Sequence, residues 1–211
     1  MKTISYIIFI FFTPALLLLN FNFLIFNHSF YKAQFAKLGV YETFGSKQVV
    51  DSQSERLIGY LCCGKDLDEG FFGERERLHL SDVRKIIILN QVMTVLLTGL
   101  VLAGLLALIL KTNEKEFAKA ILGASAIAAA AVIFLWISAL VGFDFVFLQF
   151  HFVAFDNDFW QLPPESNLIK LFPQRFFVNF ANRVAIQTLV ISIGIFLSTY
   201  YLVKRNDSKK H

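Results

Sequence analysis

Four long apolar runs constrain this chain more than any other feature of its sequence. Each holds about 18 or more consecutive uncharged residues, enough for a helix to cross a bilayer at about 1.5 Å per residue. Hydrophobic residues make up 56% of the 211 residues, and 25 residues are phenylalanine. We therefore expect an all-α polytopic membrane bundle with four transmembrane helices. The expected spans are Ile4–Phe26, Ile86–Leu110, Ala118–Val141 and Val184–Val203.

The first run could be read as a cleavable signal peptide. It is longer than the apolar part of a typical signal peptide, and no Ala-x-Ala-like cleavage site follows it. We therefore expect a retained first span, kinked at Pro14.

Basic residues indicate the orientation of the bundle. They gather at Lys2, in the loop 111–116 and in the tail 204–210, which four spans would place on one side. The positive-inside rule assigns this side to the cytoplasm. Both termini are then cytoplasmic, and the segments 27–85 and 143–183 lie on the outer face of the cell membrane.

These two outer segments are too long to be simple turns and should carry structure of their own. Helical spacing of apolar residues and helix-ending residues predict short interfacial helices within them. The expected short helices are Phe30–Leu38, 52–64 and Asn167–Phe172. We treat residues 1–211 as a single integral membrane domain.

Small residues four positions apart occur in the second and third spans, for example Gly99 with Ala103 and Ala120 with Ala124. In lipid, such residues let helices approach each other closely. Close packing of these spans would bring their outer ends together.

Two of the four histidines flank these outer ends. His79 and Asp82 precede the second span and are three residues apart, so an early helix start would put them on one face. His151 follows the third span, and Asp144 would lie two helical turns before it on the same face. An imidazole suits proton transfer near neutral pH, and a nearby carboxylate fixes its tautomer. Alternatively, Asp82 caps the second span, and His151 reaches from the interface to water.

The run that follows His151 also allows two interpretations. Asp156-Asn157-Asp158 is typical of a turn, but the Asn157 amide could stabilise an oxyanion. Trp160 could anchor the chain at the interface or support a substrate.

A metal site would be a competing chemistry. Its candidate ligands are His79, His151, Asp82, Asp156 and Asp158. No His-x-x-x-His or Glu-x-x-His pair supports it, so we expect no metal and no other cofactor. No compact basic patch with interleaved aromatic residues suggests a nucleic-acid partner.

Cys62 and Cys63 are the only cysteines, and they are adjacent. Adjacent cysteines rarely bridge each other, and the pair is not a Cys-x-x-Cys redox motif. This argues against a four-helix thiol oxidase, which would need cysteine pairs at the end of a span. We expect two thiols without a catalytic role.

The order of these residues resembles the signature of the lipoprotein intramolecular transacylase family, four-span membrane proteins of Gram-positive bacteria. One similar run is His79-Leu80-x-Asp82-Val83-Arg84, directly before the second span. The other extends from Phe143-Asp144 through His151 and Trp160 to Phe176-Phe177. Asn167 stands where the family usually has an acid.

The resemblance implies an enzyme that moves the sn-2 acyl chain of a diacylglyceryl-modified N-terminal cysteine onto the α-amine of that cysteine. The product would be a lyso-form lipoprotein, and the partners would be diacylglyceryl-modified lipoproteins and membrane lipid. The α-ammonium group, with a pKa of about 7.7–8.0, must lose a proton before it attacks the ester, a task suited to a histidine base.

In this scheme His151 would act as the base on the amine. His79, oriented by Asp82, would stabilise the oxyanion or protonate the departing sn-2 oxygen, and the two histidines could exchange roles. The residues expected to stabilise the oxyanion or position the substrate are Asn157, Asp144 and Trp160.

The residues also allow a non-enzymatic protein, such as a lipid- or lipoprotein-binding accessory, a transporter subunit or a sensor. Such a protein would need no titrating histidine. The sequence makes no prediction of oligomeric state.

Overall fold

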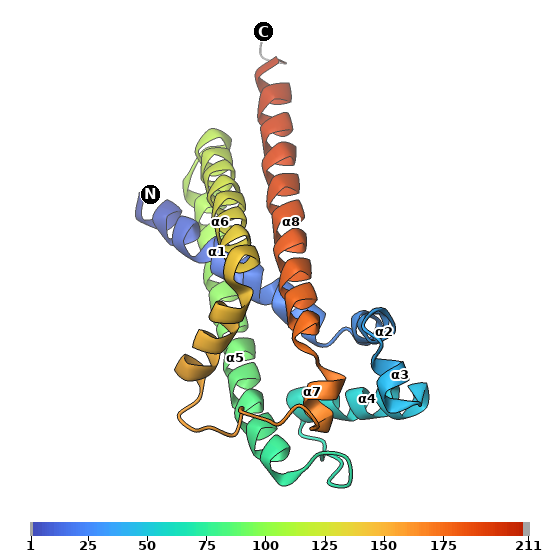
Figure 1. Ribbon diagram of the computed structural model, residues 1–211. Coiled ribbons are helices and arrows are strands. Elements are labelled where there is room, and N and C mark those ends of the chain that lie inside the picture. The colour runs from blue at the N-terminus through green and yellow to red at the C-terminus, as the bar shows by residue number, and fades with distance from the viewer. Residues whose placement is uncertain (1, 209–211) are drawn as a thin grey trace. The chain divides into compact units, whose positions relative to one another are not determined.

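The computed structural model describes residues 2–208, which form eight α-helices and no strand (Figure 1). The helices are α1 (Lys2–Ile25), α2 (His28–Lys37), α3 (Val40–Phe44), α4 (Lys47–Cys63), α5 (Glu74–Lys111), α6 (Glu114–Ala154), α7 (Asn167–Leu171) and α8 (Gln174–Ser208). The expected all-α class is confirmed.

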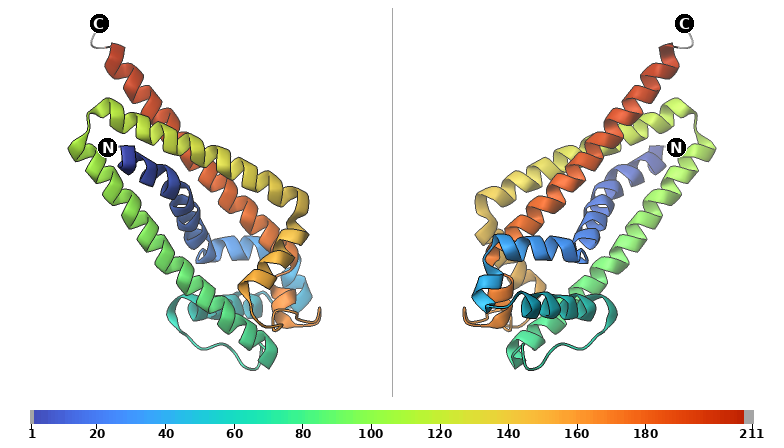
Figure 2. Two further views of the ribbon diagram at one scale, coloured as in Figure 1. Left: turned by 90° about the vertical axis from the view of Figure 1, so that its left-hand side faces the viewer. Right: turned by 90° about the vertical axis from the view of Figure 1, so that its right-hand side faces the viewer.

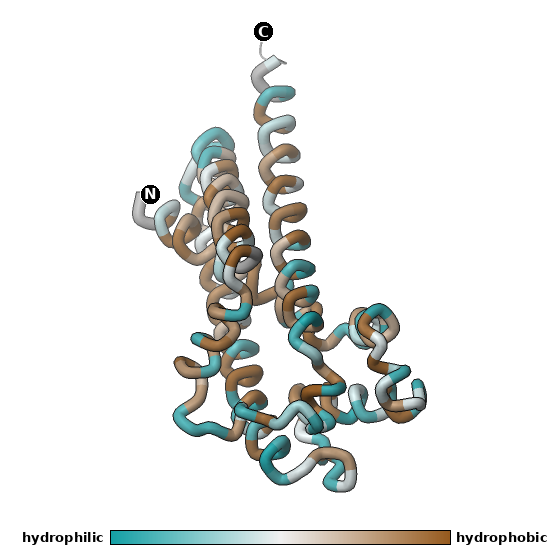
Figure 3. Tube along the Cα trace, viewed as in Figure 1, coloured by the Kyte–Doolittle hydropathy of each residue, from teal (hydrophilic) through white to brown (hydrophobic). Residues whose placement is uncertain are grey.

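Four of these helices are long and apolar enough to cross a membrane, which confirms the four expected spans. The qualifying stretches are Ile4–Ile25, Glu74–Lys111, Glu114–Ser138 and Gln174–Arg205. Apolar residues dominate these helices along most of their length (Figure 3). Two helices extend well beyond their apolar runs, since α5 begins at Glu74 instead of Ile86 and α8 at Gln174 instead of Val184. A helix can continue through charged residues, so hydropathy alone does not locate its ends.

Helix α6 continues well past the expected end of the third span at Val141. Gly142 has non-helical dihedral angles (φ −142°, ψ 42°) and kinks the helix. The kink lies one residue beyond the expected end of the third span and near the start of a shorter apolar helix, Val141–Ala154. This shorter helix carries His151.

The chain divides into two compact units. The first unit comprises Met1–Phe21, Val92–Ser138 and Arg183–His211, and the second comprises Asn22–Gln91 and Ala139–Asn182. The expected single membrane domain stays a prediction.

In the first unit, α1 packs closely against α5 and α6, which run antiparallel to each other around a short connection (Figure 2). Small residues allow this approach. A Cβ atom on Gly104 would lie 3.2 Å from the Cγ1 atom of Ile8, and one on Gly123 would lie 2.9 Å from a ring carbon of Phe9. Gly99, which we expected at a helix contact, has open space beside it instead.

Aromatic packing organises the second unit. Phe35 and Tyr31 of α2 are buried against Phe172 and Phe176, with ring centroids 5.2–6.1 Å apart. Gln34 of α2 also accepts a hydrogen bond of 2.6 Å from the side-chain amide of Asn179 in α8. These contacts hold α2 against the start of α8.

The three expected short helices correspond to α2, α4 and α7. Ser46 and Ser166 cap α4 and α7 by accepting hydrogen bonds from backbone N–H groups three residues later. Helix α4 begins at Lys47, earlier than expected, because its cap precedes the apolar pattern. Helix α3 was not predicted.

The connection between α4 and α5 is fixed through Asp68. Its carboxylate accepts hydrogen bonds from the side chains of Gln53 and Arg56, at 2.8 and 2.9 Å. The hydrogen bond from Gln53 is the main cause that lowers the pKa of the Asp68 carboxyl group. This connection leads directly into the N-terminal turns of α5.

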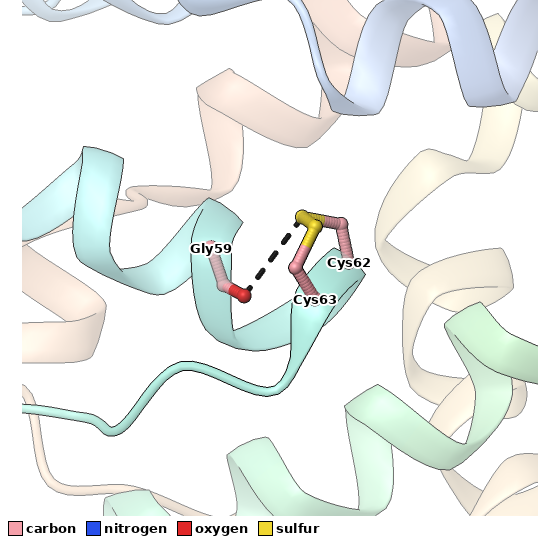
Figure 4. The surroundings of a disulfide bond; sticks show 3 residues. All are labelled: Gly59, Cys62 and Cys63. Atoms are coloured by element: carbon pink, nitrogen blue, oxygen red, sulfur yellow. Dashed lines mark hydrogen bonds between the residues drawn. A yellow bond between two sulfur atoms is a disulfide. The ribbon is translucent and has the colours of Figure 1, made fainter.

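Cys62 and Cys63 form a disulfide in the last turn of α4 (Figure 4). The expectation of two free thiols was wrong. It relied on how rarely adjacent cysteines bridge, whereas the local geometry at the end of α4 brings these two sulfur atoms together. Gly64, with φ +70°, ends the helix directly after the disulfide.

Candidate active site

His79 and His151 lie side by side in the second unit. Their ring centroids are 6.2 Å apart, and each residue is only 9% exposed. His79 comes from the second turn of α5, and His151 from the short helix that follows the kink in α6. The early start of α5 and the kink at Gly142 therefore both serve to position the pair.

A backbone contact assigns the tautomer of the neutral His151 ring. Its Nδ1 atom lies 2.6 Å from the carbonyl oxygen of Phe147. A carbonyl oxygen can only accept a hydrogen bond, so Nδ1 carries the proton. The Nε2 atom of a neutral His151 then has a free lone pair and can accept a proton from another molecule.

The His79 ring is in a different situation. Its Nδ1 atom is buried and has no hydrogen-bond partner among the described residues. Burying an N–H group without an acceptor costs about 1–3 kcal/mol, so the neutral ring is expected to carry its proton on Nε2. The two histidines thus offer complementary groups, a lone pair on His151 and an N–H donor on His79.

Aromatic rings enclose the pair. The ring centroids of Phe147, Trp160 and Phe155 lie 4.5, 5.0 and 5.6 Å from that of His151, and Phe155 is also 5.0 Å from His79. Such surroundings exclude water and strengthen hydrogen bonds to a bound substrate. Two protonated imidazoles at this separation would repel each other, which favours a pair with at most one positive charge.

Asp82 takes part in the site without a hydrogen bond to His79. One carboxylate oxygen accepts from the Asn157 side-chain amide at 2.9 Å, and the other accepts from Lys85 Nζ at 2.8 Å. Any effect of Asp82 on His79 is therefore electrostatic. Asp82 does not cap a helix start either, because α5 begins two turns earlier, at Glu74.

The run after His151 is a turn, as one interpretation predicted. The side-chain oxygen of Asn157 accepts a hydrogen bond from the backbone N–H of Phe159, at 3.0 Å, while its amide group donates to Asp82. Asp158 lies beside Arg75 of α5, with their charged atoms 3.4 Å apart. Both interactions attach this turn to α5, and the Asn157 amide already donates to Asp82.

Asp144 lies elsewhere in the second unit. Its carboxylate accepts a hydrogen bond from Gln174, the first residue of α8, at 2.8 Å. No interaction among the described residues connects it to either histidine.

Glu76 is a buried residue that the sequence reasoning missed. It is 6% exposed, and its carboxylate oxygens accept from the backbone N–H groups of Leu168 and Gly73, each at 2.6 Å. Nearby, the Asn167 amide donates to the carbonyl oxygen of Phe71 at 2.7 Å, which a carboxylate at this position could not do. Glu76 stands three residues before His79, a helical spacing that could have drawn attention to it.

The described residues contain no group of three or more His, Cys, Asp or Glu side chains arranged to hold a metal ion.

Four apolar spans and a buried histidine pair define the class: a multi-pass helical membrane protein with a site equipped for acid–base chemistry. The family model of the lipoprotein intramolecular transacylase Lit matches residues 5–177, and the chain belongs to this enzyme family. It is therefore a membrane acyltransferase that acts in lipoprotein modification. No curated protein matches the sequence.

Solved structures support the fold. The structure of the membrane integral lipoprotein intramolecular transacylase Lit from Bacillus cereus is similar, with a TM-score of 0.86 and 22% sequence identity over 98% of this chain and 97% of that chain. Two structures of the Bacillus cereus protein with one histidine replaced, by arginine or by alanine, match with TM-scores of 0.83 and 0.82 at the same identity. The match with the arginine variant covers 99% of this chain and 94% of that chain. The match with the alanine variant covers 98% of this chain and 95% of that chain.

Proposed function

We propose that this protein moves the sn-2 acyl chain of a diacylglyceryl-modified N-terminal cysteine onto the α-amine of the same cysteine, which gives a lyso-form lipoprotein. Membership of the transacylase family supports the substrate class. The observation that carries the proposal is the buried histidine pair, in which one ring offers a lone pair and the other an N–H group.

In the first step, His151 Nε2 accepts a proton from the α-amine while the amine nitrogen attacks the carbonyl carbon of the sn-2 ester. A carbon–nitrogen bond forms, and the carbonyl oxygen becomes an oxyanion. His79 Nε2–H donates a hydrogen bond to this oxyanion. Proton transfer by a positioned histidine contributes about 10²- to 10⁴-fold in rate.

In the second step, the bond between the acyl carbon and the sn-2 oxygen breaks. The proton removed from the amine is returned to this oxygen, directly from protonated His151 or through His79. The products are an amide on the cysteine nitrogen and a free sn-2 hydroxyl group, so the reaction conserves atoms and needs no cofactor. The tautomers favour this assignment of the two histidines over the exchanged one.

The neighbouring residues have supporting roles in this scheme. The Asp82 carboxylate, held by Asn157, favours positive charge on the His79 imidazole if the proton passes through it. Trp160 forms a wall beside His151 that positions acyl chains or the cysteine. Asp144 contributes by tying α6 to α8.

We further propose that the histidine pair faces the outer side of the cell membrane and that both termini are cytoplasmic. The support is the presence of basic residues at Lys2, in the segment 111–116 and in the C-terminal tail. Diacylglyceryl-modified lipoproteins and membrane lipid would then be the partners at this surface.

The test is to express the chain in a bacterium whose lipoproteins carry free α-amines and to fragment the N-terminal lipopeptide in a mass spectrometer. The acyl shift conserves mass, so only the fragments locate the acyl group. We expect it on the cysteine nitrogen with the wild-type chain, and on the glycerol with His151→Ala or His79→Ala. The matched control is His28→Ala, because His28 is exposed at the start of α2.

Loss of the product in both variants, with normal amounts of protein in the membrane, would support the proposal. Retained product in both variants would exclude histidine catalysis. An unmodified diacylglyceryl cysteine in the presence of well-expressed wild-type protein would favour a binding or accessory protein.

A further inference from the structure

Arg84 is a cation without an acidic partner among the described residues. Its side chain is half-buried, and its Nε atom is buried without a hydrogen-bond partner. Three other arginines of the same unit, Arg56, Arg75 and Arg77, each form an ion pair with an acidic residue. A buried donor without an acceptor is rare in native structures and calls for a physical explanation.

Arg84 nevertheless has a defined position. Its guanidinium group lies over the ring of Tyr60 in α4, 5.0 Å from the ring centroid. It also lies against Gly64, where an added Cβ atom would be 2.9 Å from Arg84 Nη2. A cation stacked on an aromatic ring keeps the edge of its guanidinium fork available for an oxyanion.

A second cation flanks the same helix end. Lys65 follows Gly64, and its backbone N–H donates to the carbonyl oxygen of Gly59 at 3.3 Å. Its side chain folds back over Gly59, where an added Cβ atom would lie 2.7 Å from Lys65 Cδ. No ion pair of Lys65 is present among the described residues. Figure 4 shows this end of α4, with Gly59 labelled.

We call this arrangement the α4-end notch: Gly59, Tyr60, Gly64, Lys65 and Arg84. At the end of α4, Arg84 lies against Gly64 and Lys65 lies against Gly59. The ring of Tyr60 stacks on the Arg84 guanidinium group. The notch is separate from the histidine pair, because Arg84 lies five residues after His79, about 140° away around α5.

The position of Arg84 along α5 indicates the kind of oxyanion. Charged residues are frequent from Glu74 to Lys85, and none occurs from Ile86 to Leu110. Arg84 therefore stands at the boundary between the polar and the apolar part of a membrane-spanning helix, the level of phospholipid phosphates. Basic pockets at this level bind lipid headgroups, and the guanidinium fork matches two phosphate oxygens.

We propose that the α4-end notch binds the phosphate diester of a phospholipid headgroup, with Arg84 as the bidentate donor, Lys65 as a second cation and Tyr60 as the support of Arg84. The bound lipid would hold α4 at the membrane surface. This inference does not depend on the proposed acyl transfer.

The test measures phospholipid that stays bound to the full chain. The protein is purified in a mild detergent, supplied with phosphatidylglycerol, and examined by native mass spectrometry. Loss of a charge-assisted bidentate contact should lower the affinity of Arg84→Gln for the lipid by roughly 10- to 100-fold. We expect a smaller loss in Lys65→Gln and an intermediate one in Arg84→Lys, which keeps the charge but not the fork.

The matched control is Lys37→Gln, which removes an exposed lysine that forms no ion pair within residues 2–208 and changes the net charge equally. Equal lipid retention by the wild type, Arg84→Gln and the control would overturn the proposal. Arg84 and Lys65 would then serve only to offset the partial negative charge of the carbonyl groups at the C-terminal end of α4. Should Arg84→Gln fail to fold, Lys65→Gln and Arg84→Lys decide between the same two outcomes.

A second arm distinguishes the source of the phosphate. Phosphatidylglycerol in nanodiscs should raise the melting temperature of the wild type more than that of Arg84→Lys, and millimolar inorganic phosphate in detergent should not. A larger effect from inorganic phosphate would overturn the assignment to a lipid.

Discussion

Replacing Glu76 tests how the turn that carries Trp160 is held beside the histidines. The Glu76 carboxylate accepts two backbone N–H groups, both at 2.6 Å: one from Leu168 in α7, and one from Gly73, three residues before Glu76. Leu168 is 8% exposed, so Glu76→Ala leaves its N–H group buried without a partner. Helix α7 and the preceding connection then lose an attachment to α5.

The magnitude follows from the hydrogen bond to Leu168, since only this one connects α7 to Glu76. A hydrogen bond to a charged group contributes about 1.5–3 kcal/mol, so Glu76→Ala should lower the free energy of opening of α7 by about that amount. Glu76→Gln keeps one acceptor oxygen but turns an NH₂ group toward the second N–H donor. The free energy of opening should therefore fall about half as much in Glu76→Gln as in Glu76→Ala.

Hydrogen–deuterium exchange of the protein in detergent measures this opening directly. Amides of α7 should exchange about 10- to 10²-fold faster in Glu76→Ala, with a smaller increase in Glu76→Gln. Glu165→Gln is the matched control, because Glu165 is exposed in the same connection. Unchanged exchange in α7, or an equal acceleration throughout the chain, would refute the argument that Glu76 is a local attachment.

Two further predictions concern the histidine pair and the disulfide. Acyl transfer should slow as the pH falls from about 8 to about 5, because only a neutral imidazole can accept a proton from the amine. Initial rates across this range test it, and a flat profile would argue against a histidine base. An alkylating reagent should label Cys62 and Cys63 only after reduction of the unfolded chain, adding two labels to the intact mass. Labelling without reductant would show that the bond is absent.

For the histidine pair, the sequence predicted the location of the two residues but not their tautomers. Chain order placed His79 before the second span and His151 after the third, and two adjacent antiparallel spans bring such positions to the same end of a bundle. The tautomers could not be predicted. They depend on the Phe147 carbonyl next to His151, and on His79 Nδ1, which has no hydrogen-bond partner in the part of the chain that the structure describes.

Asp82 and Glu76 form contacts that could not be predicted from the sequence. The three-residue spacing of His79 and Asp82 suggested a direct contact, but the carboxylate is occupied by Lys85 and by Asn157, which is 75 residues away in the chain. The partner of Glu76, Leu168, is 92 residues away. No local sequence pattern predicts contacts between residues that are so far apart in the chain.

The amino-acid sequence by itself determined the membrane class, the four spans and the family, because apolar length and short motifs act locally along the chain. Only the tertiary structure decided the kink at Gly142, the disulfide of Cys62 with Cys63, and which side chains share a hydrogen bond. Hydrogen bonds depend on distances of a few ångströms between segments that the chain brings together only when it folds.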